Sequence, residues 1–202
     1  MRLTSHRGSM RAATTFAGLV LFLTSLAASP ALAGDAFSLD LGVHGGVLNS
    51  KDGKTGLFVG GAQVRLHLVW LLAAELRGSY YSDSYDVSSL GGIDIKNTPV
   101  QLSAMLYLLK LPGFGLHILG GGTYNSVKLE GTGNIPGSVN SSKWAAHAGA
   151  GVDFSLSKSF LLNVDARYVF LNVDPGNLPP PSSGAYKGDY WTATGGLLWK
   201  IF

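Results

Sequence analysis

The sequence predicts an all-β protein, an eight-stranded antiparallel up-and-down transmembrane β-barrel. Three observations support this fold class. Beyond Gly34, apolar and polar residues alternate with a period of two in eight segments, and no segment keeps a helical period. Long polar connections alternate with short ones along the chain. The polar face of the alternating segments is mostly Gly, Ser, Asn, Gln and His, whereas a water-facing surface would carry many more Lys and Glu.

The first 33 residues have the organisation of an export signal. Three arginines precede an apolar segment over residues 16–27, and Ala31-Leu32-Ala33 forms a small-residue cleavage motif. A retained membrane anchor would need about 20 consecutive apolar residues, more than this segment supplies. We therefore predict a cleaved signal peptide over residues 1–33 and an outer membrane barrel over residues 34–202.

The charge of the precursor belongs mainly to this signal. Its removal takes three arginines and no acidic residue from 15 basic and 12 acidic residues, which leaves equal numbers of the two. A neutral mature chain argues against nucleic acid as a partner. The chain has no cysteine, so no disulfide framework is expected although the protein is exported. Met1 and Met10 each open a complete signal, so either can be the start.

Each predicted strand has one apolar face and one polar face. In the seventh, Val164 and Ala166 alternate with Asn163, Asp165 and Arg167. A charge turned to lipid at the bilayer midplane costs about 2 to 4 kcal/mol for a basic residue, so the pattern fixes the register. The predicted strands cover residues 37–48, 58–70, 72–81, 99–109, 116–125, 144–156, 160–171 and 190–202.

The connections differ in length at the two ends of the barrel. Short turns at one rim and long loops at the other, joining strands of about 9 to 11 residues, are typical of outer membrane barrels. The last long loop contains three consecutive prolines, which indicates either a solvated connector or a stiff surface feature used in adhesion. The predicted long polar loops are 49–56, 82–97, 126–143 and 172–189.

Alternation alone does not decide which face meets lipid, because a soluble lipocalin-like barrel has the same pattern with its apolar face inside. Aromatic residues near both ends of the strands favour a membrane barrel, which carries aromatic girdles at both interfaces. We therefore expect lipid and lipopolysaccharide outside and a polar lumen inside. The girdle residues are Phe58, Tyr80, Tyr124, Trp144 and Phe170 towards the loops, and Trp70, Phe114, Phe154, Phe160 and Trp199 towards the turns.

Seven charged residues fall on the lumen face. Eight strands leave an interior just wide enough for side chains, so a paired network that fills and stiffens the barrel is expected. An ion-conducting pore is the alternative. The residues are Asp40, Arg65, Glu75, Arg77, Asp153, Asp165 and Arg167.

The four histidines of the mature chain also point inward in this scheme. Imidazole is the commonest metal ligand, but the strand directions place these residues on two separate levels. We therefore predict polar filling of the lumen, with no metal site and no cofactor. His67 and His117 lie towards the short turns, and His44 and His147 towards the loops.

Small and apolar residues on the lumen face indicate a possible apolar route. The inward glycines either leave room for it or ease tight packing and sheet curvature. The glycines are Gly42, Gly46, Gly61, Gly121, Gly149 and Gly151, and the apolar residues are Val59, Met105, Leu119, Val169 and Leu171.

A lipid A-modifying enzyme is the rival class. A deacylase of this kind resembles a Ser-His-acid hydrolase with a closely spaced His-x-Ser on one strand. Here the residues two positions after the histidines are Gly46, Val69, Leu119 and Gly149, and none supplies a hydroxyl. We predict no catalytic residues, although a group assembled from separate strands stays open.

The last strand has two possible phases. Counting back from Phe202 in steps of two gives Lys200, Leu198 and Gly196, whereas the apolar set lies one step out of phase. A bulge near the end would reconcile them. This strand is expected to engage the barrel-assembly machinery, and the barrel is expected to be a monomer. The apolar set is Trp191, Ala193, Leu197, Trp199 and Ile201.

Two stretches carry a resemblance to a known family. "AAHAGAGVDFSLSKSFLLNVDARYVFLNVD" resembles the late strands of the OmpW family of small eight-stranded outer membrane proteins, and "TPVQLSAMLYLL" followed by "HILGGGTYN" resembles its central strands. The similarity covers about Val69 to Asp174. It implies binding or passage of small hydrophobic molecules by a narrow, partly apolar lumen.

Overall fold

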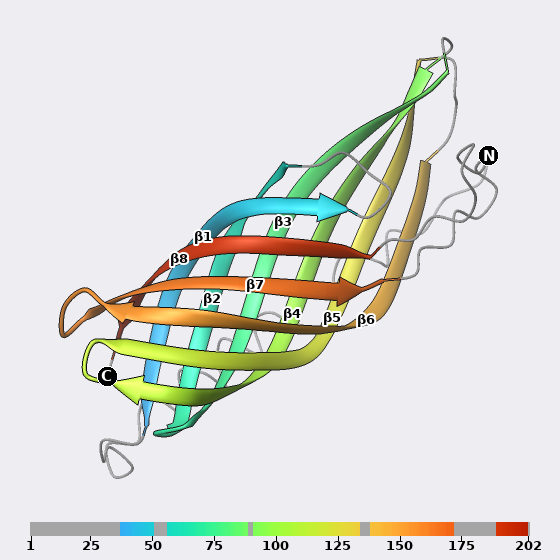
Figure 1. The fold of residues 1–202 in the computed structure, drawn as a ribbon. Helices are drawn as coiled ribbons and strands as arrows, with labels where there is room; N and C mark the ends of the chain where they lie inside the picture. The colour runs from blue at the N-terminus through green and yellow to red at the C-terminus, as the bar shows by residue number, and fades with distance from the viewer. Residues whose placement is uncertain (1–36, 51–55, 89–90, 134–137, 172–188, 202) are drawn as a thin grey trace, which may run out of the picture. The chain divides into compact units, whose positions relative to one another are not determined.

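The computed structural model describes residues 37–50, 56–88, 91–133, 138–171 and 189–201. They form eight strands that close in chain order into one antiparallel barrel, which confirms the predicted fold (Figure 1). No helix among these residues is long and apolar enough to cross a membrane. The predicted signal peptide lies outside the described residues. The strands are β1 (Ser38–Ser50), β2 (Leu57–Val69), β3 (Leu72–Ser88), β4 (Gly91–Leu111), β5 (Phe114–Gly133), β6 (Ser138–Ser155), β7 (Phe160–Phe170) and β8 (Tyr190–Lys200).

The first and last strands close the barrel. On β1, Gly45 is paired with Gly60 of β2 on one side and with Gly195 of β8 on the other. Each strand therefore has two neighbours over its membrane-spanning part. This closure satisfies the backbone hydrogen bonds that hydrocarbon cannot satisfy.

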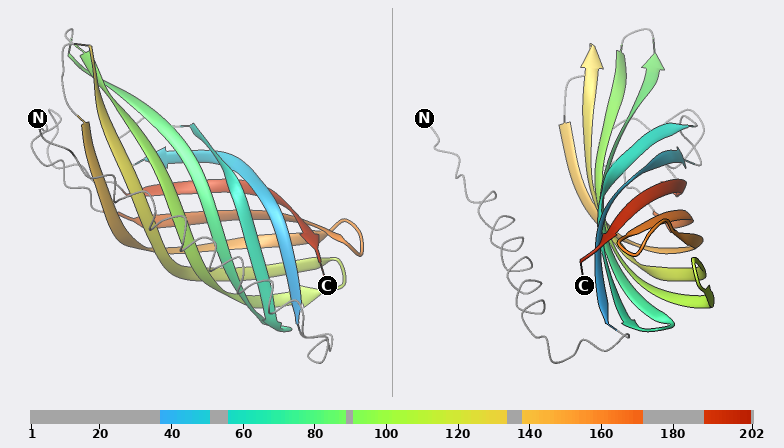
Figure 2. Two further views of the ribbon diagram at one scale, coloured as in Figure 1. Left: turned by 180° about the vertical axis from the view of Figure 1, so that it is seen from behind. Right: turned by 90° about the vertical axis from the view of Figure 1, so that its left-hand side faces the viewer.

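The strands β3 to β6 continue well beyond the others at the loop end (Figures 1 and 2). Pairing of β3 with β2 ends at Tyr80, and pairing of β6 with β7 begins at Ala146, yet β4 and β5 pair out to Gly91 and Gly133. The prediction of polar loops over 82–97 and 126–143 is therefore wrong for most of their residues, which belong to strands.

Alternation in the projecting part explains this difference. Val127 and Leu129 on β5 are buried, with Ile95 packed against them. The alternate residues Lys128 and Glu130 lie on the opposite face of the strand. A period of two is thus present in this segment despite its many Gly and Ser residues.

The outer face of the barrel is apolar. Val164 on β7 is 44% exposed, whereas its neighbours Asn163 and Asp165 are at most 2% exposed. The lipocalin-like alternative, with the apolar face inside, does not fit this distribution.

Exposed aromatic residues lie near both ends of the strands: Trp144 and Phe154 on β6 are ten residues apart. Ten residues span about 33 Å along a strand and about 25 Å along the membrane normal at a tilt of about 40°, the height of a membrane barrel's apolar band.

The inward glycines permit close approach of neighbouring strands. A Cβ atom on Gly61 would lie 1.9 Å from the carbonyl oxygen of Gly78, and one on Gly121 would lie 1.9 Å from that of Leu102. Real Cβ atoms do not approach a carbonyl so closely. These glycines therefore serve strand packing and curvature rather than leaving room for a route.

The last strand keeps a regular register. Over Tyr190–Lys200, neither the pairing with β1 nor that with β7 contains a register shift, so the described part of β8 has no bulge. Its outward residues Trp199 and Ile201 are exposed and Leu198 is buried inside, as the apolar set predicted. Phe202 lies outside the described residues.

Candidate functional site: an ionic network beneath an apolar cluster

Six of the seven predicted lumen charges form one connected network. Each is at most 3% exposed, and adjacent inward positions on a strand bring two charges together, as for Glu75 with Arg77 and for Asp165 with Arg167. The network joins four strands of the barrel. Its members are Arg65 on β2, Glu75 and Arg77 on β3, Asp153 on β6, and Asp165 and Arg167 on β7.

The centre of the network is a ring of four alternating charges, which we call the ionic ring: Glu75, Arg77, Asp165 and Arg167. Arg77 Nη2 lies 2.6 Å from Asp165 Oδ2, and Arg167 Nη2 lies 2.5 Å from Glu75 Oε1. Both contacts join β3 to β7, which are four strands apart and therefore opposite in an eight-stranded barrel. Contacts along each strand, 3.3 Å on β3 and 2.8 Å on β7, complete the ring.

A second bridge crosses the lumen from β2 to β6. Arg65 Nη1 lies 2.9 Å from Asp153 Oδ2, and Arg65 Nη2 lies 2.7 Å from Glu75 Oε2, which ties this bridge to the ionic ring. Tyr107 and Asn163 donate further hydrogen bonds to Asp153 over 2.7 and 2.8 Å. Three bases and three acids make the network formally neutral, so every buried charge has a partner.

Asp40 stands apart from the network. Its Oδ2 is 3.0 Å from Nε2 of His67, with β1 and β2 side by side at the turn end. A cavity of about 70 Å³ lies at this end, lined in part by His67, Tyr107 and Lys110.

The four histidines occupy separate places on the lumen side. His44 Nε2 is 2.9 Å from Ser79 Oγ, and His147 is 2.8 Å from Ser103 Oγ and, through its other ring nitrogen, from Thr123 Oγ1. In neither Ser-His contact does a carboxylate orient the imidazole through its second nitrogen. Among the described residues, no group of three or more His, Cys, Asp or Glu side chains is placed to hold a metal.

The fourth histidine, His117, is fully buried. Its Nδ1 lies 3.6 Å from Asp153 Oδ2, and its ring is 5.4 Å from that of Tyr107. It therefore lines the turn-side part of the network rather than a level shared with His44 or His147.

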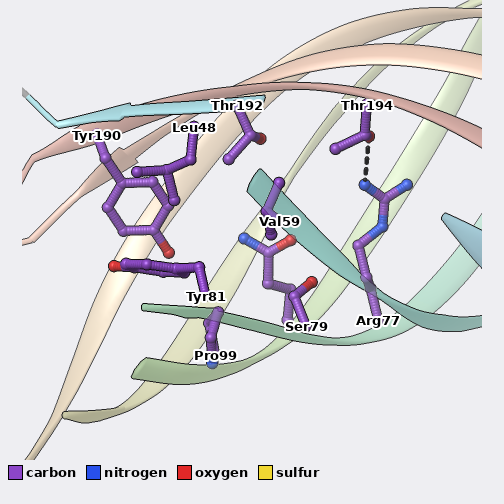
Figure 3. A pocket seen from close by; sticks show the side chains of 10 residues that line it. Leu48, Val59, Arg77, Ser79, Tyr81, Pro99, Tyr190, Thr192 and Thr194 are labelled. Carbon is purple, nitrogen blue, oxygen red and sulfur yellow. Dashed lines mark hydrogen bonds between the residues drawn. The ribbon is translucent and has the colours of Figure 1, made fainter. Parts of the chain in front are cut away.

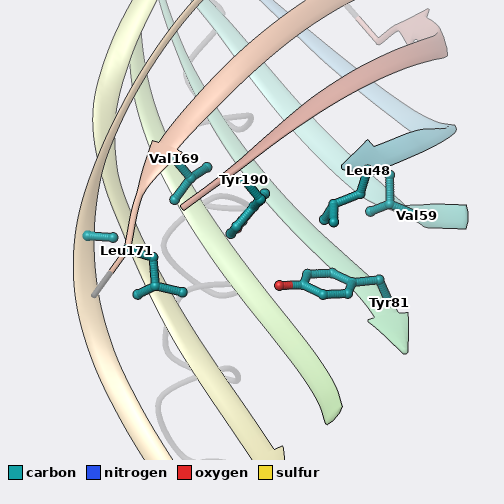
Figure 4. Packing of buried hydrophobic residues seen from close by; sticks show 7 residues of the cluster. Leu48, Val59, Tyr81, Val169, Leu171 and Tyr190 are labelled. Carbon is teal, nitrogen blue, oxygen red and sulfur yellow. The ribbon is translucent and has the colours of Figure 1, made fainter. Parts of the chain in front are cut away.

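The predicted apolar route is divided into two clusters. Along β3, Glu75 and Arg77 stand between Ala73 at the turn end and Tyr81 at the loop end, so the ionic ring separates the clusters. The five predicted residues do not line one continuous path. The outer cluster contains Leu48, Val59, Tyr81, Ala145, Val169, Leu171 and Tyr190 (Figure 4), and the inner one contains Ala73, Met105, Leu119 and Tyr107.

A small cavity lies between the outer cluster and the ionic ring. Its volume is about 10 Å³, which is room for about one water molecule. Arg77 lines its inner side and donates a hydrogen bond of 2.9 Å to Thr194 (Figure 3). The other lining residues are Leu48, Val59, Ser79, Tyr81, Pro99, Gln101, Tyr190 and Thr192.

Sequence reasoning missed the neutral residues that support these charges. Gln101 and Ser103 on β4 accept hydrogen bonds from Arg167 over 3.3 and 3.4 Å, and Tyr107 on the same strand contacts Asp153. Their inward position follows from the alternation on β4, but only the closed barrel brings them to partners on β6 and β7.

A closed antiparallel barrel with an apolar exterior and a braced ionic interior defines a small transmembrane β-barrel protein. Residues 18–197 match the family model described as outer membrane protein beta-barrel domain, and the chain belongs to this family of outer membrane proteins. A search of curated proteins finds no match.

Solved structures of bacterial surface proteins share the fold. Neisserial surface protein A (NspA) is 12% identical with a TM-score of 0.60 over 83% of this chain and 98% of its own. OprG from Pseudomonas aeruginosa is 16% identical with a TM-score of 0.55 over 82% and 97%. Ail from Yersinia pestis, in complex with the heparin analogue sucrose octasulfate, is 16% identical with a TM-score of 0.51 over 82% and 97%. At these identities the likeness concerns the fold alone.

Proposed function

We propose that this outer membrane barrel binds small apolar molecules in the loop-side half of its lumen and does not pass them along the barrel axis. The observation that carries the proposal is the stacking of the outer apolar cluster on the ionic ring. Val59 and Val169 are at most 3% exposed and face a shared interior, while Arg77 and Asp165 block the lumen directly beneath them. Apolar walls favour apolar ligands, and the ionic ring beneath them, which is neutral and fully paired, excludes ions.

The resemblance to the OmpW family supports the ligand class, because that family is associated with small hydrophobic compounds. The proposal differs from simple passage, since an axial route would have to break three bridges between opposite strands. We further propose a monomer surrounded by lipid and lipopolysaccharide, exported through its signal peptide and inserted by the barrel-assembly machinery through β8.

A structural or adhesive barrel with a plugged lumen is the second candidate. The observation that favours it is the projecting part of β3 to β6, which extends past the aromatic residues Tyr80 and Trp144. The similarly folded Ail, named as the attachment invasion locus protein, was solved in complex with a heparin analogue. An adhesive barrel would keep its surface binding when the outer cluster is altered.

The test titrates an apolar fluorophore, 1-aminoanthracene, against the full barrel in liposomes and against protein-free liposomes of the same lipid. Val169→Thr replaces a methyl group of the outer cluster by a hydroxyl at nearly constant volume, and we expect at least about fivefold weaker saturable binding, because an unpaired buried hydroxyl costs about 1 to 3 kcal/mol. Met105→Gln, a similar change in the inner cluster, is the matched control and should keep the affinity.

Two results would count against the proposal. One is the absence of a saturable component above that of protein-free liposomes. The other is efflux of the fluorophore from barrel-containing liposomes at a rate that Val169→Thr and Met105→Gln reduce equally, since this would indicate axial passage.

A further inference from the structure

The cavity above the ionic ring has two chemically different ends. On its inner side, hydrogen-bonding groups come from three strands: Ser79 on β3, Gln101 on β4 and Thr192 on β8. On its outer side, Leu48 and Val59 supply apolar walls (Figure 3). Ser79 already contacts His44, and Gln101 already contacts Arg167. Thr192 also lines the inner side, and its hydroxyl has no hydrogen bond to another described residue, so a ligand with a polar end gains a hydrogen bond there that a purely apolar ligand lacks.

The charge of the inner side is already balanced. Arg77, the only ionic residue among the described lining residues, contacts both Asp165 and Glu75. The four residues of the ionic ring carry two positive and two negative charges. An anionic ligand would therefore be buried beside a neutral group of charges, with no unpaired cation to receive it.

Two tyrosines close the outer side of the cavity. β3 runs towards the loops and β8 runs away from them, so Tyr81 and Tyr190 both lie loopward of Arg77. Their ring centroids are 5.7 Å apart in an edge-to-face contact that spans the lumen. Hydrogen bonds with Asn97 and Asn125 hold the two hydroxyls, over 2.8 and 3.3 Å. Because the cavity has room for only about one water, a larger ligand would have to move these rings apart.

From this geometry we infer that the cavity takes a neutral amphiphile, with its hydrogen-bonding end against Thr192 and its apolar end between Leu48, Val59 and the two tyrosines. The inference rests on the proposed function and narrows its ligand class. It specifies the orientation of the bound ligand, whose polar end points towards the ionic ring. It also assigns Tyr81 and Tyr190 the role of a lid.

The experiment compares three probes of similar size: benzyl alcohol, toluene and benzoate. Each is titrated against the full barrel in lipid nanodiscs while amide NMR shifts of β3 and β8 are followed. We expect benzyl alcohol to bind about fivefold more tightly than toluene, the gain of one net hydrogen bond. Benzoate should bind at least tenfold more weakly than benzyl alcohol, because its charge has no free partner.

Variants test whether the preference for benzyl alcohol over toluene arises in this cavity. Thr192→Val keeps the side-chain volume and should reduce the affinity for benzyl alcohol to that for toluene, while toluene binding stays unchanged. Thr98→Val, an equivalent change at an exposed position on β4, is the control and should change neither affinity. Tyr190→Ala should speed association of both neutral probes, because it removes one half of the lid.

Each outcome separates this inference from the proposed function. Equal binding of toluene and benzyl alcohol, unaffected by Thr192→Val, would overturn the amphiphile while the apolar site stands. Tightest binding of benzoate would overturn the neutral class and indicate an anion site at Arg77. Saturable binding by none of the probes would overturn the proposed function as well.

Discussion

Arg77 on β3 contacts Asp165 on β7 across the barrel, with its Nη2 atom 2.6 Å from the carboxylate Oδ2 atom. The two residues are 88 positions apart in the chain and stand on opposite walls. Together with the Arg167–Glu75 contact, this pair ties β3 to β7 at two points. The lumen is thereby closed at this level by direct charge pairing between opposite strands.

Removing one partner of this pair should destabilise the barrel strongly. Asp165→Asn leaves Arg77 and Arg167 buried with too little negative charge, and we expect a loss of about 3 to 5 kcal/mol in the free energy of unfolding. Urea unfolding of the barrel in phospholipid vesicles measures it. The double variant Arg77→Met with Asp165→Leu removes one charge of each sign and should recover most of the loss. Equal stability of the wild type and Asp165→Asn would mean that the ring contributes nothing to folding.

Close approach of the strands at inward glycines gives a second prediction. A Cβ on Gly121 would lie 1.9 Å from a backbone carbonyl of β4, whereas one on Gly78 would meet nothing within 4 Å. Gly121→Ala should therefore cost about 1 to 3 kcal/mol through overpacking. Gly78→Ala, the control, should be neutral or stabilise by up to about 1 kcal/mol. The urea midpoint of each variant distinguishes the two effects, and equal midpoints would contradict the steric explanation.

The alternation predicted the barrel, its register and the inward direction of charges such as Asp165 and Arg167, because a period of two is a local property. The partners of those charges were beyond local reasoning. Which residue of β3 meets Asp165 depends on the tilt and stagger accumulated over four strands. Pairs on one strand, Glu75 with Arg77 for example, were visible in the sequence, but the bridges between strands were not.

The wrong loop prediction and the open question of the inward glycines have a common cause, the ambiguity of small residues. The segment containing Val127 and Leu129 reads as a loop because Gly and Ser surround it, although its apolar residues alternate. Gly61 is compatible in the sequence with space in the lumen or with tight strand packing, and the position of the neighbouring carbonyl shows that packing applies. A small residue is compatible with a neighbouring strand packed close to the backbone and also with open space beside it. Only the folded structure shows which of the two applies.

The outward face of β7 should not tolerate a charge. Val164 lies midway along the strand, is 44% exposed and faces lipid, so Val164→Arg should cost about 2 to 4 kcal/mol. Ser126→Arg on β5, just beyond the girdle residue Tyr124, is the matched control and should cost about 0 to 1 kcal/mol. Vesicle-based unfolding and the heat-dependent gel shift of the folded barrel report both. A harmless Val164→Arg would show that this face does not lie in hydrocarbon.

The projecting part of the sheet carries a carboxylate whose ionisation can be measured. Glu130 lies six residues beyond Tyr124 on β5 and therefore outside the membrane-spanning part. Hydrogen bonds from Lys128 and Lys96 lower the pKa of its carboxyl from 4.5 to about 2. Because the folded pKa is the lower one, the stabilising contribution is complete above pH 4.5 and is lost as the pH falls towards about 2.

Carbon-detected NMR titration of the Glu130 carboxyl tests this assignment. Lys128→Met should raise the pKa of Glu130 most, because the Lys128 hydrogen bond is the largest cause, and Lys96→Met should raise it less. Lys110→Met at the turn end is the control and should leave this pKa unchanged. High salt should move the wild-type value towards that of the variants, since exposed charges are screened. A wild-type pKa near 4.5 at low salt would mean that the two lysines do not hold the carboxylate in solution.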